Sequence, residues 1–403
     1  MRGLARFLDA RLLIVIGLTL YYAWYWGSFE NFSAMVDHDP GIFPDFTKFY
    51  YPAGRAILEG SPLPDSFYYS AFAAIFFVPF ALLPFQTALV VWGIVQFAII
   101  FGLYLLFASR LPRDTVLGGV FAFLYFSSAA LLNNLKWGQV STLLFLAAFA
   151  AYVLHDQKRR WSSAAILGAA IAFKFFPAVF LVYFVFIRDW RYILTTTLMS
   201  LAWLLVMPAL LIGPQAVIQG QLAISGHASI MLNQLAMGNV DSQNFASVLG
   251  RLSGIVFPSP AGTALVIAGY GLLAGGLYLM FRIARSNAEN RAYWAWAVLA
   301  ATVPFWIPSA WPHYFVFLPF LQALTFHQLT RLDHRRRRIA IILWIFSVLF
   351  SSIFIAQAVG NWFRFAGFGS LMWSTLFSLS LTAMIVWWMP ASSSPDSAAP
   401  PPA

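Results

Sequence analysis

Long apolar runs separated by short polar segments form the dominant pattern of this chain. Several runs reach about eighteen residues, the length at which a helix can cross a bilayer. They are too many for a single anchor, and the strand alternation typical of a β-barrel is not seen. The pattern predicts an all-α polytopic transmembrane helical bundle, with spans near 11–29, 86–108, 114–133, 139–154, 192–212, 261–282, 292–309, 313–330, 339–358 and 367–389.

Two further apolar segments do not fit simple crossings. Residues 162–187 are too short to cross twice comfortably, so we expect a hairpin that starts and ends on the same side. Residues 67–84 are expected to lie in or against the outer leaflet, because counting them as a crossing would invert every later loop. These additions give about twelve membrane helices in a single domain over 1–389, and the Pro/Ser/Ala-rich residues 390–403 are predicted to be a disordered tail.

Basic residues set the predicted orientation, because cytoplasmic loops of membrane proteins are enriched in Lys and Arg. One arrangement places every basic cluster inside, and it leaves two long outer segments, 28–85 with its embedded helix and 213–260. Chemistry outside the bilayer is therefore expected on the outer face. The predicted cytoplasmic clusters are Arg2/Arg6/Arg11, Arg110/Arg113, Lys158/Arg159/Arg160, Arg188/Arg191, Arg282/Arg285/Arg291 and Arg331/Arg335/Arg336/Arg337/Arg338.

Composition narrows the function classes further. Apolar residues make up 61% of the chain and charged residues 9%, with a net charge of +10. The positive charge sits in short clusters between spans, which predicts a membrane-lipid environment and no nucleic-acid partner. There is no cysteine, so disulfides, thiolate metal sites and cysteine nucleophiles are excluded.

Two charged residues stand out because they fall outside the basic clusters of the cytoplasmic loops. Asp45 lies in the first outer segment, where it could cap a helix, pair with Lys48 three residues on, or act chemically. Lys174 lies at the apex of the predicted hairpin, where Pro177 tends to break the helix. A cation at a broken apolar apex needs an anion, and ions at such positions are functional candidates.

Several other polar residues have either a structural or a binding role. Asn134 and Gln139 lie in a predicted outer turn and either cap helix ends or bind a sugar; Gln243 opens a predicted helix and has the same two readings. Arg251 either ends that helix or binds an anion, and His313 is not needed for the aromatic belt that surrounds it. Asp37-His38-Asp39 is either a solvated turn or a metal cluster, and the turn is favoured, so no metal site is predicted.

In these pieces the chain resembles glycosyltransferase family 87, the polyprenol-phosphate-mannose-dependent mannosyltransferases of the C-type glycosyltransferase fold. The resemblance runs from about residue 45 to residue 314. Where the family usually has Tyr-Pro-Pro, this chain has Tyr68-Tyr69-Ser70. The matching pieces are Asp45 with Tyr50-Tyr51-Pro52-Ala53-Gly54 and Glu59-Gly60, Gly138-Gln139, residues 168–177, Gln243-Asn244 through Leu249-Gly250-Arg251-Leu252, and Trp311-Pro312-His313-Tyr314.

The resemblance implies a bacterial inner-membrane enzyme with a periplasmic site, a polyprenyl-phosphate sugar donor, a lipid or glycan acceptor, inversion, and no metal or cofactor. It implies that a first-loop Asp is the base, which is Asp45 here, with Asp39 and Asp241 as runners-up. A leaving phosphate needs nearby cations. We assign this role to Lys174, His313 and Arg251, with Arg55 weaker, and assign sugar or acceptor contacts to Asn134, Gln139, Gln243 and Tyr68.

A transporter or flippase of a lipid-linked saccharide is the alternative, because it would also need a charged cavity and broken helices. Transporters usually show internal repeats and coupling-ion sites at the midplane. This chain shows no repeat, and its unexpected carboxylates lie in an outer segment. The sequence therefore favours the enzyme.

Overall fold

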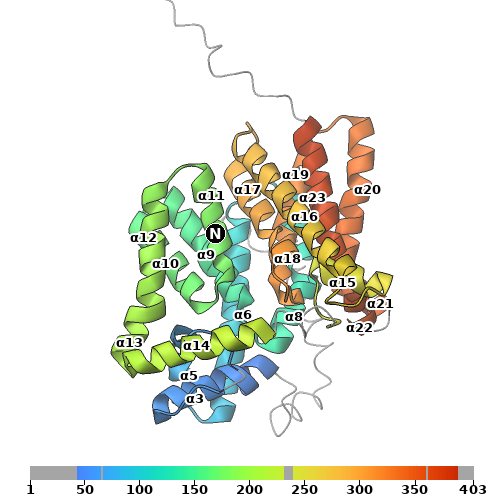
Figure 1. The fold of residues 1–403 in the computed structure, drawn as a ribbon. Helices are drawn as coiled ribbons and strands as arrows, with labels where there is room; N and C mark the ends of the chain where they lie inside the picture. Colours follow the sequence, from blue (N-terminus) through green and yellow to red (C-terminus); the bar gives the residue numbers. More distant parts are fainter. Residues whose placement is uncertain (1–42, 65–66, 231–238, 360–361, 389–403) are drawn as a thin grey trace, which may run out of the picture.

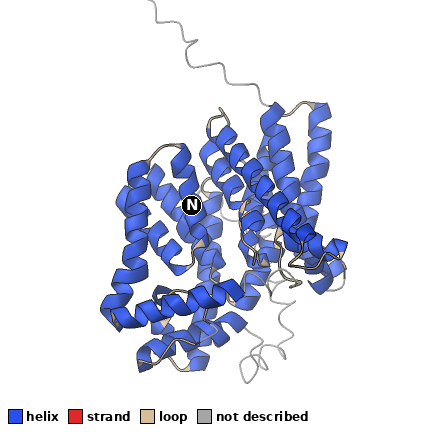
Figure 2. Cartoon of the chain, in the orientation of Figure 1, coloured by secondary structure: helices blue, strands red, loops and turns tan. Residues whose placement is uncertain are grey.

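The computed structural model describes residues 43–64, 67–230, 239–359 and 362–388. The regular elements in these ranges are helices (Figure 2), apart from one isolated antiparallel bridge between Ser128 and Ser352. The predicted all-α class is confirmed for this part of the chain. The predicted first span, the tail 390–403, and the cluster Asp37-His38-Asp39 lie outside the described residues.

Four helical stretches of the described chain are long and apolar enough to cross a membrane, so the protein is an integral membrane protein. They coincide with four predicted spans. A fifth candidate is the pair α8 (Ala129–Trp137) and α9 (Ser141–Asp156), which is bent by 117°. The four stretches are α6 (Phe85–Ala108), Trp190–Ile212, which joins α12 (Trp190–Leu201), η3 (Ala202–Val206) and α13 (Met207–Ile212), α16 (Pro260–Ala284) and α23 (Ser370–Trp388).

The described residues thus show four or five candidate spans instead of about twelve. Several predicted spans are divided into short helices, and prolines lie at many of the divisions, because proline lacks the backbone N–H that continues a helix. Pro304 and Pro319 lie in the first turns of two such helices. Predicted spans 292–309 and 313–330 become α17 (Arg291–Ala300), α18 (Val303–Trp306), η5 (Pro312–Phe315) and α19 (Leu318–Leu329).

The remaining predicted spans and loops also break into shorter elements. The span predicted at 114–133 ends early, and Ser128 starts the next helix by accepting the Leu131 N–H at 3.4 Å. The hairpin predicted at 162–187 has helices on both sides of a break at Lys174. These elements are α7 (Thr115–Phe126), α10 (Arg160–Phe173), η2 (Phe176–Phe180), α11 (Leu181–Phe186), α14 (Pro214–Ile230), α15 (Phe245–Ser253), α20 (His334–Ser351), α21 (Ile353–Ala358) and α22 (Trp362–Gly367).

Four short helices pack together at one end of the molecule (Figure 1): η1 (Phe46–Tyr50), α3 (Tyr51–Glu59), α4 (Ala71–Phe76) and α5 (Val78–Ala81). Aromatic rings hold them to the bundle. Phe46 stacks on Trp92 of α6 at 5.3 Å, and Tyr50 stacks on Phe77 at 4.6 Å. Gly54 lets α3 lie close to the backbone at Phe77, because a Cβ at position 54 would lie 2.7 Å from the Phe77 carbonyl oxygen.

The predicted basic loops meet one another at a different place, which we call the basic end. Arg110 donates to the Tyr293 hydroxyl at 3.3 Å, and that hydroxyl donates to Asp156 at 3.3 Å. Arg160 pairs with Asp189 at 3.3 Å, and Arg331 pairs with Glu289. These contacts link the loops that follow α6, α9, α11, α16 and α19, so the described basic clusters gather together. Figure 1 shows the C-terminal end of α23 far from α3, α5 and α14.

Candidate functional site

Asp45 is fixed where the chain enters its first described helix. Phe43 adopts a positive φ of 51° and donates its N–H to the Lys136 carbonyl at 3.2 Å, which docks this segment on the end of α8. Asp45 itself is 8% exposed and its side chain makes no capping hydrogen bond. Lys48 is exposed and forms no ion pair with it within 4.0 Å. Neither structural alternative for Asp45 is therefore seen.

Lys174 lies at the break between α10 and η2, in extended backbone conformation. Its ammonium nitrogen is 5.0 Å from the centre of the Tyr69 ring and 4.7 Å from that of Tyr314. It also donates to the Tyr69 hydroxyl at 3.4 Å. Two aromatic faces attract a cation without neutralising it. Lys174 therefore keeps its charge available for an anion.

A chain of hydroxyl groups runs from Lys174 into the protein. The Tyr69 and Tyr50 hydroxyls lie 2.9 Å apart, and the Tyr50 hydroxyl donates to Gln139 Oε1 at 3.1 Å. Ser70 fixes the neighbouring backbone by donating to the Ala172 carbonyl at 2.6 Å. These contacts hold η1, the start of α4, the end of α10 and the α8–α9 bend in one place.

His313 adds a fifth segment to this cluster. It lies in η5, is 4% exposed, and its Nδ1 is 3.4 Å from Asn133 Oδ1. Its Nε2 is buried and has no hydrogen-bond partner among the described residues. A buried polar atom without a partner is costly unless a ligand or water completes it. His313 thus offers a free nitrogen beside Lys174 and Tyr314.

The pKa of the Asp45 carboxyl depends on the residues around it. Burial raises the pKa of the Asp45 carboxyl to about 7, although the charge of Lys174 and, to a smaller extent, that of Lys48 act to lower it. The charge of Lys174 interacts with that of Asp45, yet no ion pair within 4.0 Å joins the two side chains. The structure thus brings the two predicted charged residues together, and within the described ranges neither has an ion-pair partner. A carboxylate with a pKa near neutrality can accept a proton at physiological pH.

Asn134 and Gln243 have structural contacts in this conformation. Asn134 lies within α8, not in the predicted turn; its amide donates to Gln96 at 3.2 Å and its carbonyl accepts the Thr142 N–H at 3.2 Å. Gln243 is fully buried and donates to the Ala366 carbonyl at 2.8 Å. The expected helix cap in this loop is Asn244, which accepts the first free N–H groups of α15.

Arg251 and Tyr68 lie differently from the other predicted residues. The Arg251 guanidinium donates to the backbone carbonyls of Asn239 and Ser242, both at 2.8 Å, so it holds the loop before α15. Tyr68 is 39% exposed, while its neighbour Tyr69 faces Lys174. Arg55, the weaker candidate, is exposed and pairs with Glu59.

Sequence reasoning missed Tyr50, Tyr69 and Asn133 as site residues and interpreted Tyr314 as part of an aromatic belt. Tyr314 is instead 3% exposed and packs against Lys174. Three of the four lie next to a residue that the sequence did single out. Hydropathy indicated the segments that carry these residues. It could not show which side chains face the site, because that depends on where each helix breaks. Within the described ranges, no three His, Asp or Glu side chains gather as a metal site.

Residues 67–310, more than half of the chain, match the profile of Glycosyltransferase family 87. The chain belongs to glycosyltransferase family 87. This membership favours the enzyme over the transporter alternative. The match includes Lys174, Gln139 and Tyr69, whereas Asp45 lies before its start and His313 after its end.

Two family 87 relatives carry the same description, polyprenol-phosphate-mannose-dependent alpha-(1-2)-phosphatidylinositol pentamannoside mannosyltransferase. The protein of Mycobacterium tuberculosis (strain CDC 1551 / Oshkosh) is 35% identical over 133 residues, covering 32% of this chain and 29% of the relative. The protein of Mycolicibacterium smegmatis (strain ATCC 700084 / mc(2)155) is 26% identical over 262 residues, covering 64% and 60%. The chain thus matches less than two thirds of either relative. No solved structure matches it.

Proposed function

We propose that this family 87 enzyme transfers a hexose, mannose in the first instance, from a polyprenyl-phosphate donor to an acceptor hydroxyl, with inversion. The reaction takes place on the extracytoplasmic face of a bacterial inner membrane, in a C-type glycosyltransferase fold, and Asp45 is its general base. The observation that carries the proposal is the buried Asp45 beside Lys174, which forms no ion pair with any described residue. The descriptions of both relatives name the donor class.

The arrangement of charge along α10 supports an extracytoplasmic site. Arg160 begins this helix at the basic end, and Lys174 follows its last residue, Phe173. Fourteen helical residues rise by roughly 20 Å. Since basic loops face the cytoplasm, the opposite end of α10 faces outward. Asp45 and Lys174 then lie near the outer boundary of the bilayer, where a lipid-linked sugar carries its phosphate.

The donor phosphate would be held by Lys174 and by His313. A polyprenyl phosphate leaves as an anion, so it needs charge stabilisation and no proton. Lys174 supplies a full positive charge. Because His313 Nδ1 faces the side-chain carbonyl oxygen of Asn133, its free Nε2 donates to the phosphate only in the imidazolium form, which a bound anion favours. Arg251 is not included here, because two of its nitrogens donate to the carbonyls of Asn239 and Ser242.

The lipid part of the donor would approach beside Lys174. Phe175, the next residue, is 57% exposed, and Tyr68 is 39% exposed on the adjoining segment. Exposed apolar side chains next to a cation match an amphipathic ligand with a phosphate and a long hydrocarbon tail. A tail that remains in lipid while the phosphate reaches Lys174 explains why the site lies at the membrane boundary.

Asp45 would act on the acceptor hydroxyl. That hydroxyl is a weak nucleophile at neutral pH, and a carboxylate within hydrogen-bond reach takes its proton as the new glycosidic bond forms. The anomeric carbon loses the polyprenyl phosphate on the opposite side, so its configuration inverts. Gln139 and the Tyr50 and Tyr69 hydroxyls lie nearby and would position sugar hydroxyls. The acceptor is a hydroxyl of a lipid or glycan.

The test compares two carboxylate variants in membranes supplied with radiolabelled polyprenyl-phosphate mannose. Asp45→Asn should reduce transfer by about 10²–10⁴-fold, the usual contribution of a general base. Asp241→Asn, the runner-up on the Arg251 loop, is the matched control and should keep most of its activity. Wild-type transfer by correctly inserted Asp45→Asn protein would refute the assignment.

A further inference from the structure

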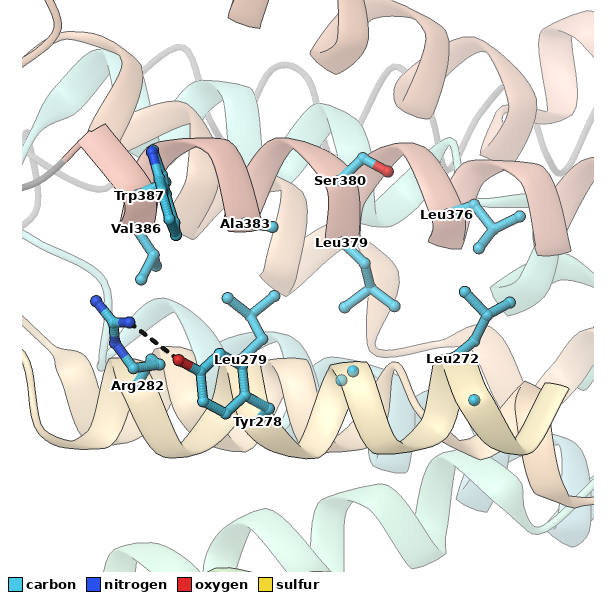
Figure 3. A pocket seen from close by; sticks show the side chains of 13 residues that line it. Leu272, Tyr278, Leu279, Arg282, Leu376, Leu379, Ser380, Ala383, Val386 and Trp387 are labelled. Atoms are coloured by element: carbon cyan, nitrogen blue, oxygen red, sulfur yellow. Dashed lines mark hydrogen bonds between the residues drawn. The ribbon is translucent and has the colours of Figure 1, made fainter. Parts of the chain in front are cut away.

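A second feature lies away from the Asp45 cluster, in a groove between α16 and α23 (Figure 3). The groove encloses about 310 Å³. None of the residues of the Asp45 cluster lines it. Figure 3 shows Leu272 and Leu376 near one end, and Arg282, Tyr278 and Trp387 near the other. The groove is therefore a separate site with a polar end and an apolar end.

Small residues make the room for this groove. Gly271, Gly275 and Gly276 lie on α16, and Ala383 lies opposite on α23. A Cβ built on Gly271 or Gly275 would meet nothing within 4 Å, so the space beside these two glycines is open. The groove is not a tight helix–helix contact within this chain.

The groove opens toward the lipid phase. Both helices are candidate membrane spans, and Ile267 and Tyr278 of α16 are 64% and 60% exposed. Trp387, at the polar end, is 81% exposed. Apolar side chains exposed on a membrane span face hydrocarbon, and Trp is enriched where hydrocarbon meets the headgroups. A hydrocarbon chain or another helix therefore fills the groove in a bilayer.

Arg282 gives the polar end its charge. It donates to the Tyr278 hydroxyl at 3.1 Å, and no carboxylate pairs with it among the ion pairs of the described residues. A guanidinium has donor groups left after this one bond, in a geometry that matches a phosphate. A phosphate group is thus the complement of this end.

The length of the groove matches one leaflet. Leu272 and Arg282 are ten residues apart on α16, a rise of roughly 15 Å. This is about half of the roughly 30 Å hydrocarbon core of a bilayer. An occupant with its phosphate at Arg282 would reach the bilayer midplane at Leu272. That is the extent of a phospholipid acyl chain, and a polyprenyl chain is much longer.

We propose that this groove binds one anionic phospholipid, with its phosphate on Arg282 and an acyl chain along Gly271 and Gly275. The positive-inside rule places the lipid in the cytoplasmic leaflet, at the opposite end of the protein from Asp45. The site does not depend on the proposed sugar transfer. A second copy of the chain, packed through its small residues, is the competing occupant.

The test uses the full chain, purified in detergent and mixed with equal amounts of phosphatidylglycerol and phosphatidylcholine. Native mass spectrometry counts the lipids bound to each protein. We expect one retained phosphatidylglycerol in the wild type. Arg282→Gln should reduce the preference for phosphatidylglycerol by about fivefold, the effect of one charge at a bilayer surface. Arg285→Gln is the matched control, because Arg285 stacks on Phe281 and does not line the groove.

A second pair of variants tests the acyl chain. At Gly275 and at Gly119 of α7 a Cβ would meet nothing within 4 Å. Gly275→Leu places its side chain in the groove and should remove the retained lipid, whereas Gly119→Leu, away from the groove, should not. Both variants should keep the melting temperature of the wild type, which separates filling from misfolding. Equal binding of the two lipids by the wild type would overturn the proposal. A dimer lost on Gly275→Leu substitution would also overturn it, in favour of a second copy.

Discussion

At the basic end, Asp189 lies 2.9 Å from His155 and 3.3 Å from Arg160. Near the other end of α10, Asp45 has no basic partner within 4.0 Å among the described residues. The pKa values of these carboxyls move in opposite directions. Burial opposes ionisation of Asp189, but hydrogen bonds from His155 and the Tyr192 N–H lower its pKa below its usual value. Burial raises the pKa of Asp45 to about 7.

The difference indicates different roles for the two carboxylates. Asp189 has its oxygens occupied by partners, and it also caps α12 by accepting the Tyr192 N–H at 3.2 Å. Such a carboxylate fixes helices and is a poor proton acceptor. Asp45 is buried without an ion-pair partner among the described residues, and a carboxyl with its pKa raised in this way is a functional-site candidate. Stability and catalysis are therefore assigned to different ends, and the predictions below test that division.

After loss of Asp45, the largest expected effect is that of Lys174→Met. The substitution keeps an unbranched side chain and removes the charge, so the donor phosphate loses a charge-assisted hydrogen bond. Such bonds contribute about 1.5–3 kcal/mol, or about 10–100-fold in kcat/KM for the polyprenyl-phosphate donor. Steady-state transfer with varied donor measures it.

Lys48→Met is the matched control for this variant. Lys48 is also a lysine near Asp45, but it is exposed and carries no contact to the tyrosine rings. We expect less than about a twofold change. Equal losses in the two variants would show that any positive charge near Asp45 suffices, and that Lys174 has no specific role.

The pH profile should give the next largest effect. Below pH 7 the Asp45 carboxyl is protonated and cannot accept a proton, so kcat/KM should rise with pH up to about 7. It should fall again above about pH 8, because burial lowers the pKa of Lys174 to about 8 and the donor phosphate then loses its cation. On the acid side it should fall by about tenfold per pH unit. Lys174 lowers the pKa of Asp45, so Lys174→Met should shift the limb to higher pH. A limb near pH 4 in both proteins would contradict the buried setting of Asp45.

Hydropathy and charge predicted much of this molecule. Apolar runs gave the ends of α6, α16 and α23 to within three residues, because long uninterrupted helices follow composition. The basic clusters predicted loops that the structure does bring together. The described residues show four or five candidate spans, so the predicted number of about twelve is not shown, and the reason is local. Prolines such as Pro304 and Pro319 start short helices inside runs that are apolar throughout, and a hydropathy count does not register them.

The sequence indicated the charged residues of the candidate site better than its neutral ones. Asp45 and Lys174 were visible because charge is rare in this chain. Tyr69 was not distinguished from Tyr68, since which of two adjacent tyrosines faces Lys174 depends on the turn before α4, capped by Ser70. For Asn134 the sequence left a helix cap and a sugar contact open. In the structure its side chain accepts the Thr142 N–H at the start of α9 and donates to Gln96 of α6.

Asp189→Asn should lower the stability of the fold, whereas Asp45→Asn should lower the rate of transfer. Losing the hydrogen bonds of a charged group should lower the free energy of unfolding by about 1–3 kcal/mol, with transfer per folded molecule unchanged. Asp45→Asn should not lower stability at pH 8. The folded pKa of about 7 lies above the usual 3.8, so the ionised carboxylate opposes folding at that pH and a neutral amide does not. Melting temperatures and specific activities of both variants measure this. A loss of stability in Asp45→Asn would mean that its charge supports the fold.

The smallest predicted effect concerns two tyrosine hydroxyls, one near each end. Tyr69→Phe removes the hydroxyl between Lys174 and Tyr50, so the ammonium group is held less precisely and donor KM should rise by about fivefold, the size of one neutral hydrogen bond. The pH limb should stay near 7. Tyr192→Phe removes the bond to Ser163 and should lower the melting temperature without changing donor KM. If both variants changed only the melting temperature, Tyr69 would be structural, and the separation of roles between the two ends would not extend to their neutral groups.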